Sequence, residues 1–320
     1  MSLLIRKPGI HTTVQDTGRT RARSFGVNPN GPMDTAAQRL VNIIIGNDES
    51  EGVLEMHFPA PEIEFDADAM IAIGGADFGA NVDDVSISNW SNAFVPQGSV
   101  VTFEKKISGN RAYLAVRGGF RIDKWLGSAS TNLIAGVGGV SGRKLMPGDR
   151  IVCGASTRGS DQNTIGASIL PRYSRFPTVR VLAASEYEFL TPVAARMFLG
   201  EGFTLTNHCD RMGYRMTGKP LHLLDDLQMV SSAVTFGTIQ LLPDGQIIIL
   251  MADHQTSGGY PRIANVISVD LPILGQCGPG DGVSFTMVSI EDAERLVLEF
   301  ENKLNFLRVG CRLQNHNAVD

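Results

Sequence analysis

The chain has 320 residues and a formal net charge of −5, with 28 Lys and Arg against 33 Asp and Glu. This length suits two domains of about 150 residues each, and the slightly acidic balance argues against a protein that coats nucleic acid or binds an anionic membrane. With 43% hydrophobic and 19% charged residues, the composition excludes a disordered chain. The 35 Gly and 15 Pro favour a fold with many turns.

The N-terminus and the cysteines indicate a cytoplasmic protein. Residues 1–9 lack the apolar core of a signal peptide and reach a proline at Pro8. The long apolar runs, such as Ile247–Ala252, are far shorter than the ~20 residues of a membrane helix. The four cysteines are widely spaced and contain no C-x-x-C pair, so we expect them to be reduced and mostly buried.

In chain order, most of the sequence consists of short runs rich in Val, Ile, Phe and Thr, separated by Gly, Pro, Asn and Asp. Such runs of four to seven residues predict β-strands. Their regular spacing favours antiparallel sheets that are closed or sandwiched, and no alternating βαβ units are visible. The clearest predicted strands are 70–73, 100–103, 112–116, 178–182, 247–251 and 283–288.

Three helices are predicted between these strands. The first covers Thr35–Ile45, because its apolar residues recur at i, i+3, i+4, i+7 and i+8, with Asp34 as N-cap and Gly46 as the residue after the C-cap. The second begins after Thr191, with a proline at its first position, and ends near Gly200. The third begins at Ser289 and carries a stripe of apolar residues: Leu296, Phe300, Leu304 and Leu307.

A short sequence motif that occurs twice suggests that the chain has two related halves. The phrase Pro-Gly-Asp followed by an apolar strand occurs at Pro147–Ile151 and at Pro279–Val283. We therefore divide the chain into two β-rich domains, 1–175 and 176–320, and allow for exchange of end segments between them.

Several common sites are not indicated. Residues 136–142 are glycine-rich but match neither a dinucleotide fingerprint nor a Walker A loop, which leaves a tight loop as the main interpretation and an anion-binding nest as the alternative. The six histidines never pair at metal-ligand spacing, so no transition-metal site is predicted. No serine lies in a G-x-S-x-G elbow. Mg²⁺ accompanying a nucleotide stays possible, since one or two carboxylates suffice for it.

Four polar and glycine-rich clusters stand out: Thr12–Arg19, Gly31–Asp34, Asp210–Arg215 and Ala252–Arg262. Arginine side chains bind carboxylates and phosphates at two points. Glutamine, tyrosine and glycine backbone can hold an amide from both its donor and its acceptor side. The alternative is a surface network of Asp and Arg with turn glycines. Residue chemistry alone thus indicates a β protein with a site for a carboxylate or an amide.

These clusters, together with Phe236–Gln240, resemble the allophanate-hydrolase-subunit-2 family, which includes the C subunit of bacterial ATP-dependent 5-oxoprolinase and the carboxyltransferase part of urea carboxylase. The resemblance extends from about residue 3 to about residue 305. It implies a mainly β protein with two cyclophilin-like antiparallel β-barrel domains and a few short helices. It also implies two partners, the 5-oxoprolinase B subunit (allophanate hydrolase subunit 1-like) and the 5-oxoprolinase A subunit.

The reaction implied by the resemblance opens the lactam of 5-oxoproline to glutamate, coupled to ATP hydrolysis. We expect Arg211 and Arg215 to bind the substrate carboxylate or a phosphate, and Gln255 and Tyr260 to hold the lactam amide. Asp253 is the expected base or Mg²⁺ ligand, and Asp253, Gln255 and Arg215 form the expected catalytic set. The other expected substrate contacts are Tyr214, Gly258, Gly259, Gln15, Asp16, Arg19 and Asp34.

Two other functions remain open. One is the carboxyltransferase component of a biotin-dependent, urea carboxylase-like enzyme, whose biotin carrier would be another chain because no biotin attachment site occurs here. The other is a regulatory subunit that binds an inhibitor of a sensor kinase. The substrate is in every enzyme interpretation a small-molecule amide.

Overall fold

The computed structural model divides into two compact units by its internal contacts. The first unit contains Met1–Arg19, Asn30–Pro171 and Glu301–Asp320, and the second contains Thr20–Pro29 and Arg172–Phe300. Each unit thus receives a segment that is distant in sequence from its main part. The residues that the structure describes are 1–154, 164–166, 168–225, 227 and 229–317.

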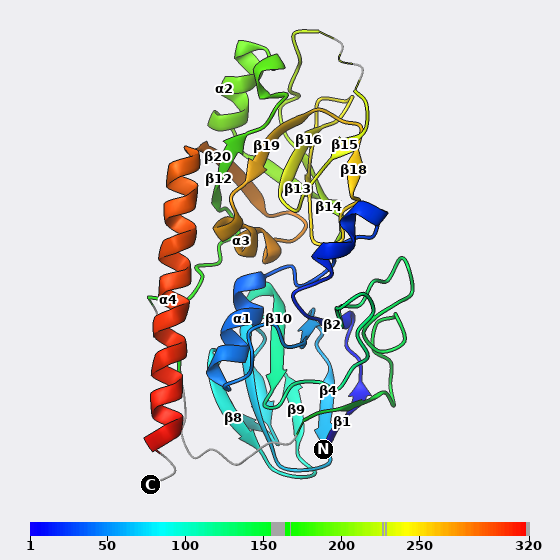
Figure 1. The fold of residues 1–320 in the computed structure, drawn as a ribbon, viewed down its shortest axis with the longest axis vertical. Helices are drawn as coiled ribbons and strands as arrows, with labels where there is room; N and C mark the ends of the chain where they lie inside the picture. Colours follow the sequence, from blue (N-terminus) through cyan, green and yellow to red (C-terminus); the bar gives the residue numbers. More distant parts are fainter. Residues whose placement is uncertain (155–163, 167, 226, 228, 318–320) are drawn as a thin grey trace. The chain divides into compact units, whose positions relative to one another are not determined.

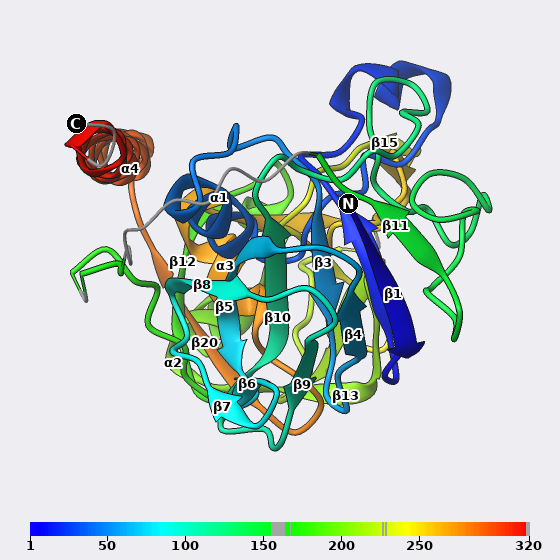
Figure 2. The same cartoon turned by 90° about the horizontal axis from the view of Figure 1, so that it is seen from below.

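The first unit has two antiparallel sheets, counted over the residues that the structure describes, and neither closes into a barrel. In Figure 2, β8, β5, β10 and β3 follow one another in one of them. One sheet has the order β11 (Arg150–Val152), β1 (Ser2–Lys7), β4 (Glu62–Phe65), β9 (Val100–Phe103), β6 (Ala80–Val82), β7 (Val85–Ser86). The other has the order β2 (Thr12–Gln15), β3 (Val53–Met56), β10 (Ser108–Val116), β5 (Ala69–Asp77), β8 (Ser91–Val95).

A single apolar core fills the space between the two sheets of this unit. In β4 the residues alternate, with Ile63 and Phe65 buried and the glutamates between them half-buried, as expected for a strand with one solvated face. Strand β5 is buried on both faces, because one face joins the core and helix α1 (Thr35–Ile44) packs on the other. Gly74 permits this approach, since a Cβ atom there would lie 2.8 Å from Cγ1 of Val41 in α1.

Helix α1 confirms the predicted first helix. Asp34 is its N-cap and accepts a hydrogen bond of 2.8 Å from the backbone N–H of Ala37. Gly46 follows the helix with a φ of 76°, the left-handed conformation that the sequence predicted for it.

The second unit is built around a closed barrel. Its strands follow the order β12 (Thr178–Ala183), β19 (Arg262–Val266), β16 (Thr238–Leu241), β17 (Ile247–Leu250), β14 (Gly213–Thr217), β13 (Phe203–Cys209), β20 (Gly282–Met287). All neighbours are antiparallel except β12 and β20, which pair in parallel where the barrel closes. A separate short ribbon pairs β15 (Ser232–Ala233) with β18 (Ser257–Gly258).

Helix α2 (Pro192–Gly200) packs on the barrel strand β20. Thr191 caps its N-terminus and Pro192 is its first residue, as predicted. Phe198, fully buried, stacks on Phe285 with ring centroids 4.8 Å apart and lies near Phe203. The remaining helical segments are η1 (Thr20–Phe25), η2 (Tyr187–Phe189), η3 (Ser268–Asp270), α3 (Leu271–Gly275) and α4 (Ile290–Asn317).

The prediction of a mainly β protein with few helices is confirmed, with three corrections. The first half forms two open sheets in the described residues, whereas a closed barrel was predicted. The second half closes through one parallel pair, although every pair was predicted to be antiparallel. The C-terminal helix α4 is not short: it has 28 residues, and its length is evident in Figure 1. No helix in the described part of the chain is both long and apolar enough to span a membrane.

Candidate functional site

A pocket of about 260 Å³ opens on the barrel of the second unit. Its polar lining comes from β13 and the turn after it, from β14 and β16, and from the segment that leads into β19. Ile248 of β17 is the register partner of both Arg215 in β14 and Gln240 in β16, so the three residues form one row across the sheet and point to the same face. The full lining is His208, Asp210, Met212, Gly213, Arg215, Gln240, Leu242, Ile248, Leu250, Gln255 and Tyr260.

Three residues that the sequence predicted to bind the ligand, Arg215, Gln255 and Tyr260, line this pocket together. Arg215 is exposed and forms no ion pair with any residue that the structure describes. The side chain of Gln255 is half-buried, and within the described ranges no hydrogen bond engages its amide. An unpaired guanidinium beside a free amide can bind a small anion that also carries a carbonyl group.

Gln240 received no role from the sequence, yet it lies in the pocket wall with no exposed surface. Its Nε2 donates a hydrogen bond of 3.3 Å to the carbonyl oxygen of Tyr260. Its Oε1 is buried and has no hydrogen-bond partner among the described residues. The available signal was a glutamine within the apolar run Thr238–Leu242, where a polar side chain needs a partner.

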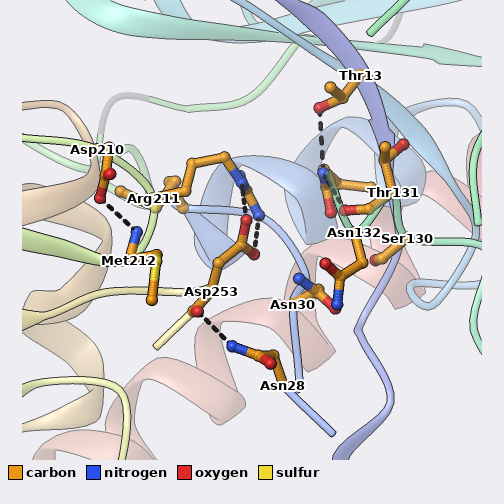
Figure 3. Close-up of polar contacts among 12 residues, drawn as sticks. Thr13, Asn28, Asn30, Ser130, Thr131, Asn132, Asp210, Arg211, Met212 and Asp253 are labelled. Atoms are coloured by element: carbon orange, nitrogen blue, oxygen red, sulfur yellow. Dashed lines mark hydrogen bonds and ion pairs between the residues drawn. The ribbon is translucent and has the colours of Figure 1, made fainter. Parts of the chain in front are cut away.

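Arg211 and Asp253 bind each other and not the pocket. The Nε and Nη2 atoms of Arg211 each lie 2.9 Å from a carboxylate oxygen of Asp253, and both side chains are 8% exposed (Figure 3). The backbone N–H of Asp253 also donates to the carbonyl of Arg211 at 2.7 Å. Arg211 and Asp253 thus form a buried ion pair, and the expected roles of Arg211 as an anion ligand and of Asp253 as a base or Mg²⁺ ligand stay predictions.

Asn28 fixes the segment that contains this ion pair. Its Nδ2 donates to the carbonyl oxygens of Asp253 and His254 at 2.7 and 2.8 Å, the first of which is drawn in Figure 3. His254 is buried, and burial lowers the pKa of its imidazole. The segment is thus held from both its side chains and its backbone.

Tyr214 faces the interior of the barrel. It is 1% exposed, and its hydroxyl donates a hydrogen bond of 3.3 Å to the carbonyl oxygen of Cys277. Strand alternation explains this, because Arg215 and Tyr214 are neighbours and point to opposite faces. Tyr214 thus lies in the core of the barrel, and its expected substrate contact stays a prediction.

The two predicted glycines lie close to the pocket with different neighbours. A Cβ atom on Gly258 would lie 2.6 Å from Nε2 of Gln240, so this glycine permits close approach to a side chain of the protein. Gly259 and Tyr260 line an adjoining pocket of about 560 Å³, which shares Leu242 and Tyr260 with the first. Tyr260 thus forms the wall between two pockets of the second unit.

In the first unit, Gln15 of β2 resembles Gln240 in its hydrogen bonding. Its Nε2 donates to Oγ1 of Thr13 at 3.1 Å and to the carbonyl of Thr131 at 3.4 Å (Figure 3). Its Oε1 is buried and without a hydrogen-bond partner in the described part of the chain. A ligand role for Gln15 stays a prediction.

Asp16 organises a loop of the first unit. Its carboxylate accepts hydrogen bonds from the hydroxyl groups of Ser128 and Ser130 and from the backbone N–H groups of Gly18 and Ala129. These donors hold a carboxylate that is 4% exposed, so Asp16 stabilises the loop, and its expected contact with substrate stays a prediction.

Arg19 is likewise engaged within the first unit. Its guanidinium donates to Oδ1 of Asn30 and to the carbonyl of Ser130, and it lies 5.2 Å from the ring centroid of Trp125. The residue is 2% exposed. Arg19 therefore stabilises the same loop, and its expected role toward substrate stays a prediction.

Asp34 caps helix α1 and is fully buried. Its own backbone N–H donates to the hydroxyl of Tyr113 at 2.8 Å. The carboxylate of Asp34 is turned toward the helix terminus, and its expected substrate contact stays a prediction.

The titratable side chains do not assemble a metal centre in the described residues, where no group of three or more His, Cys, Asp or Glu could hold an ion. The side chain of His316 lies outside the described residues. The four cysteines are free, and burial raises the pKa of the Cys153 thiol to about 12. Nucleophilic cysteine chemistry is therefore disfavoured at Cys153.

The chain is similar to known proteins both in sequence and in structure. The chain is 36% identical over 296 residues to the 5-oxoprolinase C subunit of Haemophilus influenzae, which covers 92% of this chain and 94% of that protein. It is 35% identical over 317 residues to the 5-oxoprolinase C subunit of Escherichia coli, which covers 98% and 100%. The crystal structure of the Kluyveromyces lactis urea carboxylase superposes with a TM-score of 0.91 at 26% identity, covering 96% of this chain but only 29% of that one. A family model for the carboxyltransferase domain, subdomain A and B, matches residues 25–287. The chain therefore belongs to this family, as a relative of the two 5-oxoprolinase C subunits.

Proposed function

We propose that this chain is the C subunit of an ATP-dependent 5-oxoprolinase complex, which opens the lactam of 5-oxoproline to glutamate. The match to two 5-oxoprolinase C subunits over 94% and 100% of their own lengths supports this assignment. The urea carboxylase, by contrast, is more than three times longer than the part that this chain matches. A whole-subunit match favours a chain that acts as a separate subunit.

The unpaired Arg215 in the barrel pocket is the observation that carries the proposal. Urea is neutral, whereas 5-oxoproline carries one carboxylate, and one guanidinium without an acidic partner matches one carboxylate. We assign the substrate carboxylate to Arg215 and the lactam carbonyl oxygen to the amide of Gln255. Tyr260 would cover the bound ring, since its side chain is 45% exposed at the pocket edge.

The proposed chemistry needs activation, because an unstrained amide is a poor electrophile. Transfer of the γ-phosphoryl group of ATP to the lactam oxygen, with release of ADP, would make the ring carbonyl carbon more electrophilic. Addition of water to that carbon and cleavage of the ring C–N bond, with a proton taken up by the nitrogen, would give the acyl phosphate of glutamate. A second water would then release phosphate and glutamate. We assign none of the pocket residues to ATP or to Mg²⁺, since one guanidinium matches one carboxylate and a triphosphate carries several more negative charges. The nucleotide site would instead involve the partner A and B subunits.

The fold and location follow from the same assignment. We propose that the barrel of the second unit is a cyclophilin-like domain and that the two sheets of the first unit form an opened variant of it. The closed barrel of the second unit supports the first part of this proposal. A cytoplasmic location fits a complex that consumes ATP and a small amide.

The test is oxoproline-dependent ATP turnover by the chain reconstituted with the A and B subunits. Arg215→Ala should lower kcat/KM about ten- to a hundredfold, because a charge-assisted hydrogen bond contributes about 1.5–3 kcal/mol. The matched control is Arg196→Ala, since Arg196 is an exposed arginine on α2 in the same unit and outside the pocket. Unchanged turnover in Arg215→Ala would refute the assigned site.

A second candidate function is carboxyl transfer to urea from a biotin carrier on another chain. It is favoured by the family membership and by the TM-score of 0.91 against urea carboxylase. Incubation with a biotin carboxylase, a biotinylated carrier, ATP, bicarbonate and urea would distinguish the two. We expect no carboxylated urea, and its formation would replace the oxoprolinase proposal.

A further inference from the structure

A histidine lies beside the unpaired arginine in the barrel pocket. Cys209 of β13 pairs with Tyr214 of β14, and His208 precedes the first of these residues while Arg215 follows the second. Arg215 points away from the barrel interior that Tyr214 occupies, because neighbouring residues of a strand alternate. His208 is likewise exposed, and both residues line the pocket. The imidazole is therefore open to a ligand that Arg215 binds.

The ring of His208 has no structural role in the protein. The backbone N–H of His208 donates to Oγ1 of Thr206 at 3.2 Å, which involves the main chain only. Among the described residues, no hydrogen bond or ion pair engages the ring. The ring is thus available to exchange a proton with a ligand, a reaction for which imidazole is well suited near neutral pH.

The other titratable groups of the pocket are less suited to this step. Oδ1 of Asp210 accepts the backbone N–H groups of Met212 and Gly213 at 2.8 and 3.1 Å, so this carboxylate holds the turn after β13 (Figure 3). A guanidinium keeps its proton in proteins, which excludes Arg215 as a proton donor. A phenol such as that of Tyr260 releases a proton far less readily than an imidazolium does.

Opening of a lactam needs a proton at the ring nitrogen. An amide nitrogen leaves as an amine when an acid protonates it as the C–N bond breaks. In the proposed reaction, the adduct of water and the phosphorylated lactam can collapse in two ways. Loss of the ring nitrogen gives the acyl phosphate, whereas loss of phosphate restores the lactam and consumes one ATP without ring opening. Phosphate is the better leaving group, so ring opening requires a positioned acid.

The anchor for the carboxylate also determines where the ring nitrogen lies. In 5-oxoproline this nitrogen is bonded to the carbon that carries the carboxylate, so a carboxylate bound to Arg215 keeps the nitrogen next to the anchored group. His208 belongs to the strand that pairs with the strand of Arg215. The ring nitrogen is thus the reacting atom closest to the two cationic side chains.

We propose that His208 is the proton donor that commits the adduct to ring opening. The inference rests on the proposed function for the substrate, and it adds the residue that decides between ring opening and loss of phosphate. The imidazolium of His208 gives its proton to the ring nitrogen as the electron pair of the C–N bond passes to that nitrogen. The hydroxyl group derived from water becomes the new carbonyl and releases its proton to the neutral imidazole, so His208 returns to its initial state.

The test is the number of ATP molecules hydrolysed for each glutamate formed by the chain reconstituted with the A and B subunits. ADP and glutamate are both measured in the presence of 5-oxoproline, and the wild-type complex should use about one ATP per glutamate. His208→Gln should lower kcat for glutamate formation about a hundredfold and raise the ATP consumed per glutamate above about ten, because a general acid contributes at least this much. KM for 5-oxoproline should change little, since Arg215 still binds the carboxylate.

Two further variants separate proton donation from a general disturbance of the pocket. His222→Gln is the matched control, because His222 is an exposed histidine of the same unit that lines the adjoining pocket and not this one. Its kcat and its ATP consumed per glutamate should equal the wild-type values. In His208→Ala, added imidazole should restore glutamate formation and lower the ATP consumed per glutamate, whereas it should restore nothing in Arg215→Ala.

The outcomes separate this inference from the proposed function. An ATP-to-glutamate ratio near that of the wild type in His208→Gln, at any rate of turnover, would overturn the inference and leave the oxoprolinase proposal standing. So would a failure of imidazole to restore glutamate formation in His208→Ala. Absence of oxoproline-dependent ATP hydrolysis in the wild-type complex would refute the proposed function, and this inference with it.

Discussion

Replacing Asp253 by alanine removes one partner of the buried ion pair in the second unit and leaves Arg211 charged. The two side chains meet at two points, with Nε–Oδ2 and Nη2–Oδ1 distances of 2.9 Å, and each is 8% exposed. We expect Asp253→Ala to lower the free energy of unfolding of this unit by about 3–5 kcal/mol, the usual result of removing one partner of a buried ion pair.

The double variant Arg211→Met, Asp253→Leu distinguishes an uncompensated charge from lost packing. It removes both charges and keeps apolar volume, so it should recover at least about half of the loss. The backbone hydrogen bonds from Asp253 to Arg211 and from Asn28 to Asp253 would remain. An exposed pair in the same unit, Lys219 with Glu201, is the control, and Glu201→Ala should cost no more than about 1 kcal/mol.

The choice of probe follows from the positions of the tryptophans. Both of them, Trp90 and Trp125, belong to the first unit. Tryptophan fluorescence during denaturation therefore reports the first unit, whereas circular dichroism reports both. Asp253→Ala should shift only a circular dichroism transition to lower denaturant concentration.

Two results would contradict the structural interpretation of this pair. One is a free energy of unfolding of Asp253→Ala within about 0.5 kcal/mol of the wild-type value, combined with complete loss of oxoproline-dependent turnover. That result would support the catalytic role for Asp253. The other is a double variant that is as unstable as the single variant, which would mean that the charges themselves stabilise the unit.

Two further predictions concern the core of the second unit. His254 is buried and its pKa is lowered mainly by that burial, so the folded state binds a proton less readily than the unfolded chain. The free energy of unfolding should therefore fall as the pH drops below about 6.5. In thermal melts between about pH 7 and 5, His254→Gln should flatten this dependence, whereas the exposed His208→Gln should not. Phe198→Ala should destabilise the unit by about 3–5 kcal/mol, because it leaves a cavity beside the stacked ring of Phe285; a loss below about 1 kcal/mol in circular dichroism melts would show that the site collapses or is not packed.

Most of the local structure of this protein could be predicted from its sequence. Asp34 and Gly46 mark the ends of the first helix, and Thr191 with Pro192 marks the start of the second, because caps depend on side chains within a few residues of one another. The strands follow likewise from alternating apolar residues. Resemblance across the ordered polar clusters gave the family, which the comparisons confirm.

The roles of the charged residues could not be obtained in this way. Arg211 and Arg215 are four residues apart in one motif and equally suited to an anion by composition, yet one is buried against Asp253 and the other is unpaired in the pocket, as far as the described residues extend. The difference arises because Asp253 is 42 residues away and reaches Arg211 only in the folded barrel. Asp16, Arg19 and Asp34 were assigned to substrate for the same reason, since their partners are distant in sequence or on the backbone.

Sequence alone determined where strands and helices begin, which clusters carry polar chemistry and to which family the chain belongs, because these depend on short-range patterns and on residue order. Tertiary structure alone decided that the first half stays open while the second half closes through a parallel pair, across the residues described. It also decided that Gln240, from an apolar strand, belongs to the lining of the same pocket as Arg215 and Gln255. Closure and pairing depend on which distant strands and side chains meet, and residue spacing does not encode that directly.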